Sequence, residues 1–474
     1  MKKIVPGFLL LLFLAFYSAA GGEGVTRCLL AGVDHFVSLP DTAPAAANNL
    51  RRMEGLLRAH LDREAEVTAS LDGPGSVSKF RELFSETFSE AGPEDCSVIY
   101  FSTHGVRAED GTAFLLSDGI SEEGLSPETL REMLDTLPGE KILILDACYS
   151  GAFIGKGVRD GKNRLAGEKT RVLVSAGGEE DSYFWQDSSG DGGSYFLAAM
   201  ESLLKDPETG DIDGDGYLSL QEVTDGIRAL CGVSRAYCWP EDSGRALFRN
   251  DGEGPDGSPC SGLRFTTVEE DAFKPSAEIV FSASGPMHLW YQTVPWKEGK
   301  WDFESAVKLP DRERYEGSRG QIGPGEKNRT VRLASVDGEK SGTALLQILS
   351  VTDGKTRPEG SRRMALTGDG EVSLTVDILG GTDETGGLIT ADLPCFVTVT
   401  AENEAGETVR TMAKGEACIP DAGLYVYWSG LDENGAVCPA GIYRFRAVCT
   451  DAYGVREAFS EGFAIGEKEK GQSK

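Results

Sequence analysis

The stretch Lys141-Ile-Leu-Ile-Leu-Asp-Ala-Cys-Tyr-Ser-Gly151 decides how the rest of the chain is interpreted. Four consecutive apolar residues, Ile142 to Leu145, precede an acid, a cysteine and a glycine-containing turn. A short apolar run bounded by turn residues is typical of a buried parallel strand. We therefore expect Cys148 where this strand leaves the sheet, which is where sites collect in open α/β sheets.

A second run of the same kind covers residues 96–106, Cys-Ser-Val-Ile-Tyr-Phe-Ser-Thr-His-Gly-Val, and places His104 at the end of its own buried strand. Two adjacent parallel strands would deliver a thiol and an imidazole to one sheet edge, which is the minimum needed for a cysteine nucleophile with a base beside it. The alternative for Cys148 is a buried inert thiol, and the alternative for His104 is a core histidine with its hydrogen bonds satisfied. For either residue taken alone, the alternative is commoner than a catalytic role.

The first half of the chain alternates strand-like and helix-like segments. Expected strands cover residues 28–36, 65–70, 113–118 and 171–177, and expected helices cover 45–61, 77–88 and 194–204, with one more starting at the Ser126-Pro127 cap. This alternation predicts an α/β domain over residues 21–260, with a mostly parallel sheet covered by helices on both faces.

Helical periods vanish from about Leu263, and short alternating strands appear between Gly- and Asp-rich turns. This pattern predicts two all-β sandwich domains, at residues 265–382 and 386–466. The polar tail, residues 467–474, is expected to be disordered. Aromatic residues in the first of them are more typical of a sandwich core than of a ligand site; they are Trp290, Tyr291, Trp296 and Trp301.

The amino terminus resembles a secretory signal. Met1-Lys2-Lys3 precedes an apolar run from Phe8 to Tyr17 and then small residues, which predicts a signal peptide over residues 1–20 and export to the periplasm or beyond. No other stretch is long and apolar enough to predict a membrane span. The net charge of −29 argues against nucleic acid or an anionic membrane as partner, and it fits calcium binding.

The chain has ten cysteines, which could form disulfides in an exported protein. Cys231 and Cys238 are close in sequence, and Cys418, Cys438 and Cys449 fall in one small domain, but connectivity does not follow from spacing. No spacing predicts a zinc site, since there is no CxxC and only four histidines.

The segments Phe-Ser-Thr-His-Gly-Val (101–106) and Ile-Leu-Asp-Ala-Cys-Tyr-Ser-Gly-Ala-Phe (144–153) resemble the His-Gly and Asp-x-Cys-x-Gly blocks of caspase-like cysteine peptidases, the group of caspases, metacaspases and bacterial relatives. The resemblance covers roughly residues 25 to 250. It implies a caspase-like fold, Cys148 as nucleophile, His104 as base and acid, and the N–H groups of Gly105 and Cys148 as an oxyanion hole. A neighbouring imidazole should favour the thiolate, so we expect a low thiol pKa and fast alkylation of Cys148.

The resemblance also implies a substrate pocket. Metacaspase-like members use acids to bind Arg or Lys before the cleaved bond, and Asp146 matches one of them. At the second position this chain has Asn49, which removes a charge and puts basic specificity in doubt. A structural cap on the nucleophile turn is the other interpretation of Asp146.

Loop 155–171 follows the nucleophile and is rich in basic residues, namely Lys156, Arg159, Lys162, Arg164, Lys169 and Arg171. Charges and glycines without periodicity predict an exposed, easily nicked loop. Caspases are processed in the corresponding linker, so the resemblance suggests self-cleavage here after Arg or Lys. A solvated basic loop without processing is the alternative.

Residues 211–222 fit the twelve-residue EF-hand calcium loop. Asp211, Asp213 and Asp215 occupy positions 1, 3 and 5, Gly216 makes the turn, and the remaining ligands are the Tyr217 carbonyl, Ser219 and Glu222. Helices are expected before it (194–204) and after it (220–230). We predict that Ca²⁺ stabilises local structure, an acidic surface turn being the alternative.

The last domain carries Trp428-Ser-Gly-Leu-Asp-Glu-Asn-Gly435 and Pro439-Ala-Gly-Ile-Tyr443, which resemble the Ig-like domain of flagellar hook-capping proteins. That resemblance implies a spacer, adhesion or protein-docking module without chemistry. The sequence as a whole thus predicts a secreted, calcium-binding, caspase-like cysteine endopeptidase acting on protein or peptide substrates. The alternative is an inactive peptidase-like scaffold for surface adhesion or protein binding.

Overall fold

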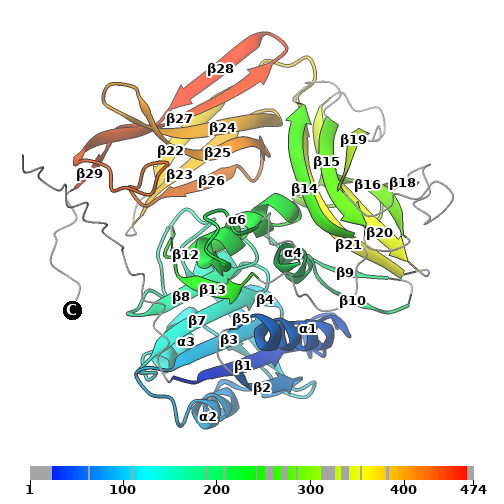
Figure 1. The fold of residues 1–474 in the computed structure, drawn as a ribbon, viewed down its shortest axis with the longest axis vertical. Helices are drawn as coiled ribbons and strands as arrows, with labels where there is room; N and C mark the ends of the chain where they lie inside the picture. The colour runs from blue at the N-terminus through cyan, green and yellow to red at the C-terminus, as the bar shows by residue number, and fades with distance from the viewer. Residues whose placement is uncertain are drawn as a thin grey trace, which may run out of the picture.

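The structure is a computed structural model with three folded units, an α/β unit and two β sandwiches (Figure 1). In Figure 1 the α/β unit lies at the bottom, the first sandwich at the upper right and the second at the upper left. The predicted signal peptide (1–20) and the predicted disordered tail (467–474) lie outside the described residues, which are 24–61, 65–108, 111–187, 189–205, 210–241, 243–250, 260–269, 276–283, 287–310, 326–332, 341–352, 355–379 and 384–466.

A six-stranded sheet organises the α/β unit, in the order β12-β8-β7-β3-β1-β2. All neighbouring pairs are parallel except β12, which runs antiparallel to β8 at one edge. The strands are β1 (Thr26–Gly32), β2 (Ala65–Leu71), β3 (Cys96–Ser102), β7 (Glu140–Asp146), β8 (Thr170–Val174) and β12 (Tyr237–Trp239). β3 and β7 are buried along nearly their whole length, as expected for central parallel strands.

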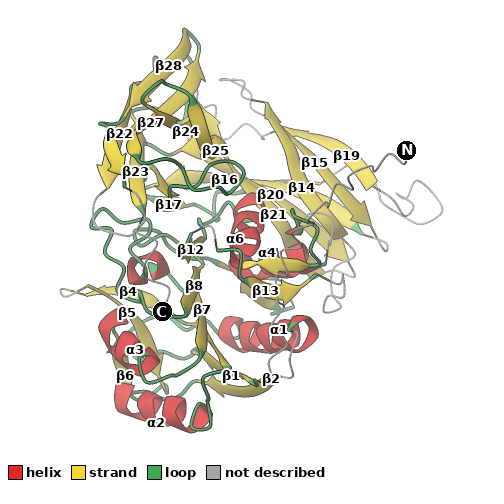
Figure 2. Ribbon diagram, turned by 60° about the vertical axis from the view of Figure 1, so that its left-hand side comes forward, coloured by secondary structure: helices red, strands yellow, loops and turns green. Residues whose placement is uncertain are grey.

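Helices cover both faces of this sheet, as Figure 2 shows. One face packs against α1 (Ala45–His60), α4 (Tyr195–Leu204) and α6 (Leu220–Leu230), and the other against α2 (Val77–Thr87) and α3 (Pro127–Leu134). The predicted cap of α3 is confirmed: Ser126 Oγ accepts from Thr129 N at 3.1 Å, with Pro127 at the first helical position.

Short elements complete the edge of the unit where the strands end. They are the antiparallel sheet β4 (Gly105–Ala108), β5 (Gly111–Ser117) and β6 (Glu122–Leu125), the 3₁₀ helix η1 (Ser150–Phe153), and the ribbons β9 (Phe184–Gln186) with β10 (Gly192–Ser194) and β11 (Tyr217–Ser219) with β13 (Ala246–Arg249). β4 and η1 directly follow His104 and Cys148, so both predicted reactive residues lie between regular elements.

The first sandwich joins a three-stranded and a four-stranded sheet with a side strand. Its strands are β14 (Cys260–Glu269), β15 (Ser276–Ala283), β16 (His288–Lys297), β17 (Lys300–Trp301), β18 (Val307–Pro310), β19 (Glu326–Arg332), β20 (Gly342–Thr352) and β21 (Lys355–Leu366). Trp301 is buried and donates from Nε1 to Val233 O at 2.8 Å, so this sandwich packs directly on the α/β unit.

The second sandwich consists of β22 (Leu374–Leu379), β23 (Thr385–Ala391) and β26 (Leu424–Trp428) facing β24 (Cys395–Asn403), β25 (Thr408–Cys418), β27 (Gly441–Asp451), β28 (Gly454–Phe459) and β29 (Phe463–Ile465). Trp428 fills its core, as the sequence predicts. Because β22 pairs with β23, the predicted boundary at 382–386 is wrong and falls inside this sandwich. The first sandwich likewise begins at Cys260 rather than at 265.

No disulfide joins any of the ten cysteines, all of which lie in the described residues, and every one except Cys148 is buried. The disulfides that the sequence allows are therefore not formed in this structure. Among the described residues, no helix combines the length and apolar character needed to cross a membrane.

Candidate active site

The two predicted reactive residues follow strands that pair with each other. β3 and β7 are parallel neighbours whose last registered pair is Ser102 with Asp146. Each strand then needs only two more residues to reach His104 and Cys148. The thiol and the imidazole therefore lie at the same edge of the sheet, as the sequence predicts.

Gly105 brings the two loops into backbone contact. A Cβ on this residue would overlap the carbonyl oxygen of Cys148, so no larger residue fits without moving the nucleophile. Gly105 also starts β4, which pairs with β5 through Gly105 and Phe114. The glycine after the histidine thus permits a close approach of backbone to backbone, next to the reactive thiol.

His104 is held by a backbone carbonyl and an aromatic ring. Its Nε2 lies 3.2 Å from the oxygen of Pro40, and its ring centroid lies 4.5 Å from that of Phe36. A carbonyl oxygen can only accept, so Nε2 carries the proton in this contact and Nδ1 is left with a lone pair in the neutral ring. The histidine can therefore act as a proton acceptor through Nδ1.

Cys148 is half-buried and contacts the backbone of Ser182. The N–H of Ser182 points at Sγ from 3.3 Å, and its carbonyl oxygen lies 3.5 Å from the same sulfur. Burial and the charge of Asp181 raise the pKa of the Cys148 thiol to about 12. The predicted low thiol pKa is therefore wrong for this state, because burial of the sulfur disfavours a thiolate and the charges of Asp181 and Asp146 add to that effect.

The nucleophile turn is tight and fixed by its neighbours. Tyr149 has φ 59°, a left-handed conformation that costs a non-glycine residue about 1–3 kcal/mol. Its N–H donates to Glu180 O at 2.9 Å, and Gly151 N donates to Ala176 O at 2.9 Å. The loop after β8, residues 175–183, therefore supports both the turn and the sulfur.

Asp146 and Asn49 lie buried in one polar network beneath the nucleophile. Tyr100 donates to Asp146 Oδ2 at 3.1 Å, while Asn49 Oδ1 accepts from Ser194 N at 2.9 Å and its Nδ2 donates to Ser102 Oγ at 2.9 Å. The hydroxyl of Ser194 also reaches Asp146, which links the two predicted pocket residues.

The carboxyl of Asp146 is poised to titrate near neutrality. Burial raises its pKa to about 6, and hydrogen bonds from Ser194 and Tyr100 oppose that shift. Four hydroxyl groups form hydrogen bonds with this carboxyl, those of Ser194, Tyr100, Ser175 and Ser182. This arrangement is compatible with a structural cap and with the floor of a pocket.

Loop 155–171 is less exposed than predicted. Lys156 is buried, Arg171 belongs to β8, and Arg164 forms ion pairs with Asp160 at 3.0 Å and Glu128 at 3.4 Å. The exposed basic side chains of the loop are those of Arg159, Lys162 and Lys169. The expectation of one freely accessible basic loop is therefore wrong at Lys156, Arg164 and Arg171.

Residues 25–229 match the family model described as Caspase domain. This segment has a caspase-like α/β fold. The match covers the paired strands, both reactive residues and the acidic loop, and it ends before the two sandwiches.

Several solved structures are similar to part of the chain. A protein from Geobacter sulfurreducens is 14% identical over 46% of this chain and 93% of its own, with a TM-score of 0.34. Caspase-1 from Spodoptera frugiperda is 15% identical over 43% and 75%, with a TM-score of 0.30. A secreted C11 cysteine protease from Bacteroides thetaiotaomicron, solved with an irreversible peptide inhibitor, is 16% identical over 33% and 50%, with a TM-score of 0.25. No curated protein matches the chain.

The acidic loop of the α/β unit brings its predicted ligands together. Carboxylate oxygens of Asp211, Asp213 and Asp215 lie within 4.8 Å of one another. Glu222 points back into the loop, where its two oxygens accept from Ile212 N and Ser219 N, each at 2.8 Å. Ser219 caps α6, which begins and ends at the predicted residues, and Tyr217 lies in β11. The donor set, all oxygen and mostly carboxylate, fits a hard cation such as Ca²⁺.

Several residues of the site escape sequence reasoning. Pro40 and Ser182 act through backbone groups, which carry no residue signature. Asp181 follows two acids, Glu179 and Glu180, and only that run of charge after the strand β8 could have drawn attention to it. Ser194 was expected as the start of a helix, and it does cap α4, but its contact with Asp146 depends on the fold.

Proposed function

We propose that the caspase domain of this chain is a cysteine endopeptidase in which Cys148 is the nucleophile and His104 the general base and acid. One observation carries the proposal: the two residues follow paired strands, and Gly105 packs its backbone against the carbonyl of Cys148. A nucleophile and a base at one sheet edge, with the base oriented by a third group, form the usual arrangement for acyl transfer.

The raised thiol pKa selects the order of proton transfer. At neutral pH the thiol of Cys148 is protonated, so sulfur must lose its proton to Nδ1 of His104 as it attacks the substrate carbonyl. The imidazolium then protonates the leaving amine, and the C–N bond breaks to give a thioester. Water, deprotonated by the same histidine, hydrolyses the thioester and restores the thiol.

The oxyanion of each tetrahedral intermediate needs donors in a fixed position. The N–H groups of Gly105 and Cys148 are the candidates, since both belong to the backbone contact between the two loops. Such donors are worth about 10²–10³ in kcat when one is removed. Their rigidity comes from β4 on one side and the nucleophile turn on the other.

Asp146 supports a preference for Arg or Lys before the cleaved bond. It is an acid two residues before the nucleophile, and it is ionised above its pKa of about 6. Asn49 adds a neutral acceptor next to it rather than a second charge. We expect a basic preference that is weaker than that of a pocket with two acids.

Calcium binding at residues 211–222 is part of the proposal. The ligands would be carboxylates of Asp211, Asp213, Asp215 and Glu222, the Tyr217 carbonyl and Ser219, and the ion would stabilise the start of α6. We also propose that the protein is exported and that its second sandwich is Ig-like. Self-cleavage in loop 155–171 would occur after Arg159 or Lys162, because these are the exposed basic residues in its middle.

The test is hydrolysis of fluorogenic peptides that differ only in the residue before the scissile bond. Wild type and Cys148→Ala are compared with and without Ca²⁺, and their intact masses are recorded. Cleavage after Arg or Lys that disappears in Cys148→Ala supports the dyad and the pocket. Cleavage after Asp or Asn keeps the dyad and removes the role of Asp146. No hydrolysis and no processing in any condition would favour the inactive scaffold.

A further inference from the structure

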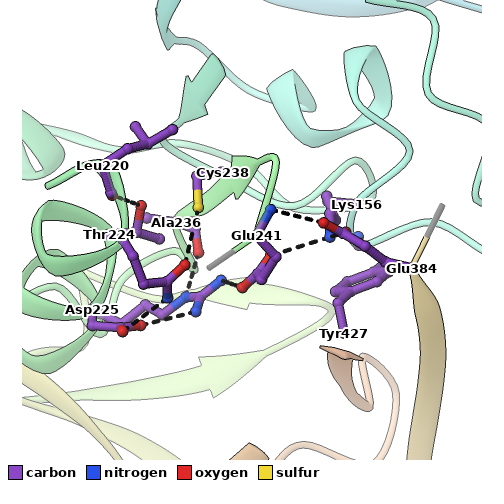
Figure 3. A network of polar contacts seen from close by, with 12 residues as sticks. Lys156, Leu220, Thr224, Asp225, Ala236, Cys238, Glu241, Glu384 and Tyr427 are labelled. Carbon is purple, nitrogen blue, oxygen red and sulfur yellow. Dashed lines mark hydrogen bonds and ion pairs between the residues drawn. The ribbon is translucent and has the colours of Figure 1, made fainter. Parts of the chain in front are cut away.

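The segment that follows the nucleophile turn is anchored in the second sandwich (Figure 3). Lys156 is 2% exposed, and its Nζ pairs with Glu384 and, at 3.1 Å, with Glu241. The same Nζ lies 3.9 Å from the centre of the Tyr427 ring, and the hydroxyl of Tyr427 accepts from Gly157 N at 2.7 Å. Glu384 and Tyr427 belong to the sandwich, 228 and 270 residues after their partners.

The charges of this contact are balanced by a continuous network. Glu241 also pairs with Arg228 at 3.2 Å, and Arg228 pairs with Asp225 at 3.1 Å. Glu384 accepts from the backbone N–H of Glu241 at 2.7 Å through its other oxygen. Burial acts to lower the pKa of Lys156, but the charges of Glu241 and Glu384 outweigh burial and raise it. Lys156 is thus charged, and the loss of Glu241 or Glu384 would leave a buried charge uncompensated.

The backbone of the anchored segment braces the active site. Lys156 N donates to Gly151 O at 2.8 Å in the nucleophile turn, and Lys156 O accepts from Gly178 N at 2.9 Å. A Cβ on Gly157 would lie 2.6 Å from Gly177 Cα, so the packing there is close. Gly177 and Gly178 start the loop that carries Ser182 to the sulfur of Cys148.

The first sandwich anchors the same loop from its other side. Arg363 of β21 pairs with Glu180 Oε1 at 2.9 Å, and the other carboxylate oxygen of Glu180 accepts from Gly177 N and Arg235 N. The carbonyl of Glu180 accepts from Tyr149 N, directly after the nucleophile. Both sandwiches therefore hold the loops that surround Cys148.

We propose that the two sandwiches position the active site, with Lys156 and Glu180 as positioning residues and with Glu384, Tyr427 and Arg363 as their anchors. None of the five touches Cys148 or His104 in the contacts described above; they act through the nucleophile turn and the loop 175–183. The catalytic consequence rests on the proposed peptidase function, whereas the structural coupling does not. The sandwiches are then integral parts of the enzyme and not only spacers.

The test uses the full chain with two variants and two matched controls. Glu384→Gln removes one anchor charge, and Tyr427→Phe removes only the hydroxyl that holds Gly157. The control Glu402→Gln removes another buried carboxylate of the same sandwich, paired with Arg444 at 3.0 Å. The control Tyr443→Phe removes a hydroxyl that donates to Pro439 O at 2.7 Å. Hydrogen exchange of segments 149–157 and 176–183 is measured together with kcat and KM.

Glu384→Gln should speed exchange of both segments at least tenfold and Tyr427→Phe at least twofold, with kcat falling by similar factors and KM changing less than twofold. The two controls should leave both segments and kcat at wild-type values. The proposal is overturned if Glu384→Gln and Tyr427→Phe leave exchange unchanged, or if the controls speed it equally. If wild type hydrolyses no peptide, the proposed function fails, but the exchange measurements still decide the coupling.

Discussion

The sheet edge with Cys148 and the acidic loop 211–222 lie in the same α/β unit but are built in opposite ways. The acidic loop is local: twelve consecutive residues supply the atoms that are proposed to bind Ca²⁺ and the cap of α6. The sheet edge is assembled from residues far apart in the chain, including Pro40, His104, Cys148 and Ser182. A local site can be moved or lost as a unit, whereas an assembled site depends on each of its supports.

The largest expected effect is a loss of peptide hydrolysis at the sheet edge without a loss of Ca²⁺ binding at the acidic loop. Cys148→Ala should lower kcat/KM for the best peptide by roughly 10⁴-fold or more, since the nucleophile is lost. The variant should still bind Ca²⁺, because the acidic loop is independent of the nucleophile. Peptide hydrolysis and calcium titration measure the two properties, and a variant that keeps hydrolysis would refute the assigned nucleophile.

The next effect tests whether the sheet edge depends on a single backbone contact. Gly105→Ala places a methyl group onto the carbonyl of Cys148, so the nucleophile must shift. A displacement of about 1 Å costs roughly 10²-fold in rate. The control is Gly55→Ala in α1, where a Cβ meets nothing within 4 Å and helix propensity should gain up to about 1 kcal/mol. Equal activity of both variants would contradict the close approach.

A smaller, pH-dependent effect concerns Asp146. Its pKa of about 6 means that its charge appears as the pH rises from 5 to 7. The ratio of kcat/KM for an Arg peptide to that for its neutral citrulline analogue should therefore rise by about tenfold over this range. The ratio cancels the ionisation of His104 and Cys148, which both substrates share. In Asp146→Asn the ratio should be flat, and a rise that persists there would assign it to another group.

The last effect concerns stability rather than rate and tests the local site. Saturating Ca²⁺, at about 100 times its dissociation constant, should stabilise the folded chain by about 2.7 kcal/mol and raise the unfolding temperature by several degrees. Glu222→Gln should lose most of this shift. The control Glu132→Gln removes an exposed surface carboxylate and should keep it. An identical melting temperature with Ca²⁺ and with chelator would count against the site.

Sequence reasoning was most successful where the signal was local. The strands that lead to His104 and Cys148, the cap at Ser126 and the helix 220–230 all follow from short patterns of apolar and capping residues. The conformation of the acidic loop could be predicted for the same reason. These features depend on neighbours in the chain and not on tertiary contacts.

Predictions from the sequence were wrong where a contact with a residue far away in the chain determines the structure. Lys156 looked like one more exposed basic residue, but Glu384 lies 228 residues away and buries it. The expected low pKa of Cys148 is wrong because folding buries the sulfur and adds the charges of Asp181 and Asp146, neither of which can be predicted from spacing. The boundary at 382–386 failed because β22 pairs across the gap with β23.

The separation of Lys156 and Glu384 in the sequence also determines how long after Lys156 its partner is synthesised. A ribosome adds about 5–20 residues per second, so the 228 residues between them take roughly 11 to 46 s to synthesise. The sheet that carries Cys148 can fold early in that interval, but its anchor emerges only near the end. The turn after Cys148 therefore stays without its anchor until the second sandwich has been made.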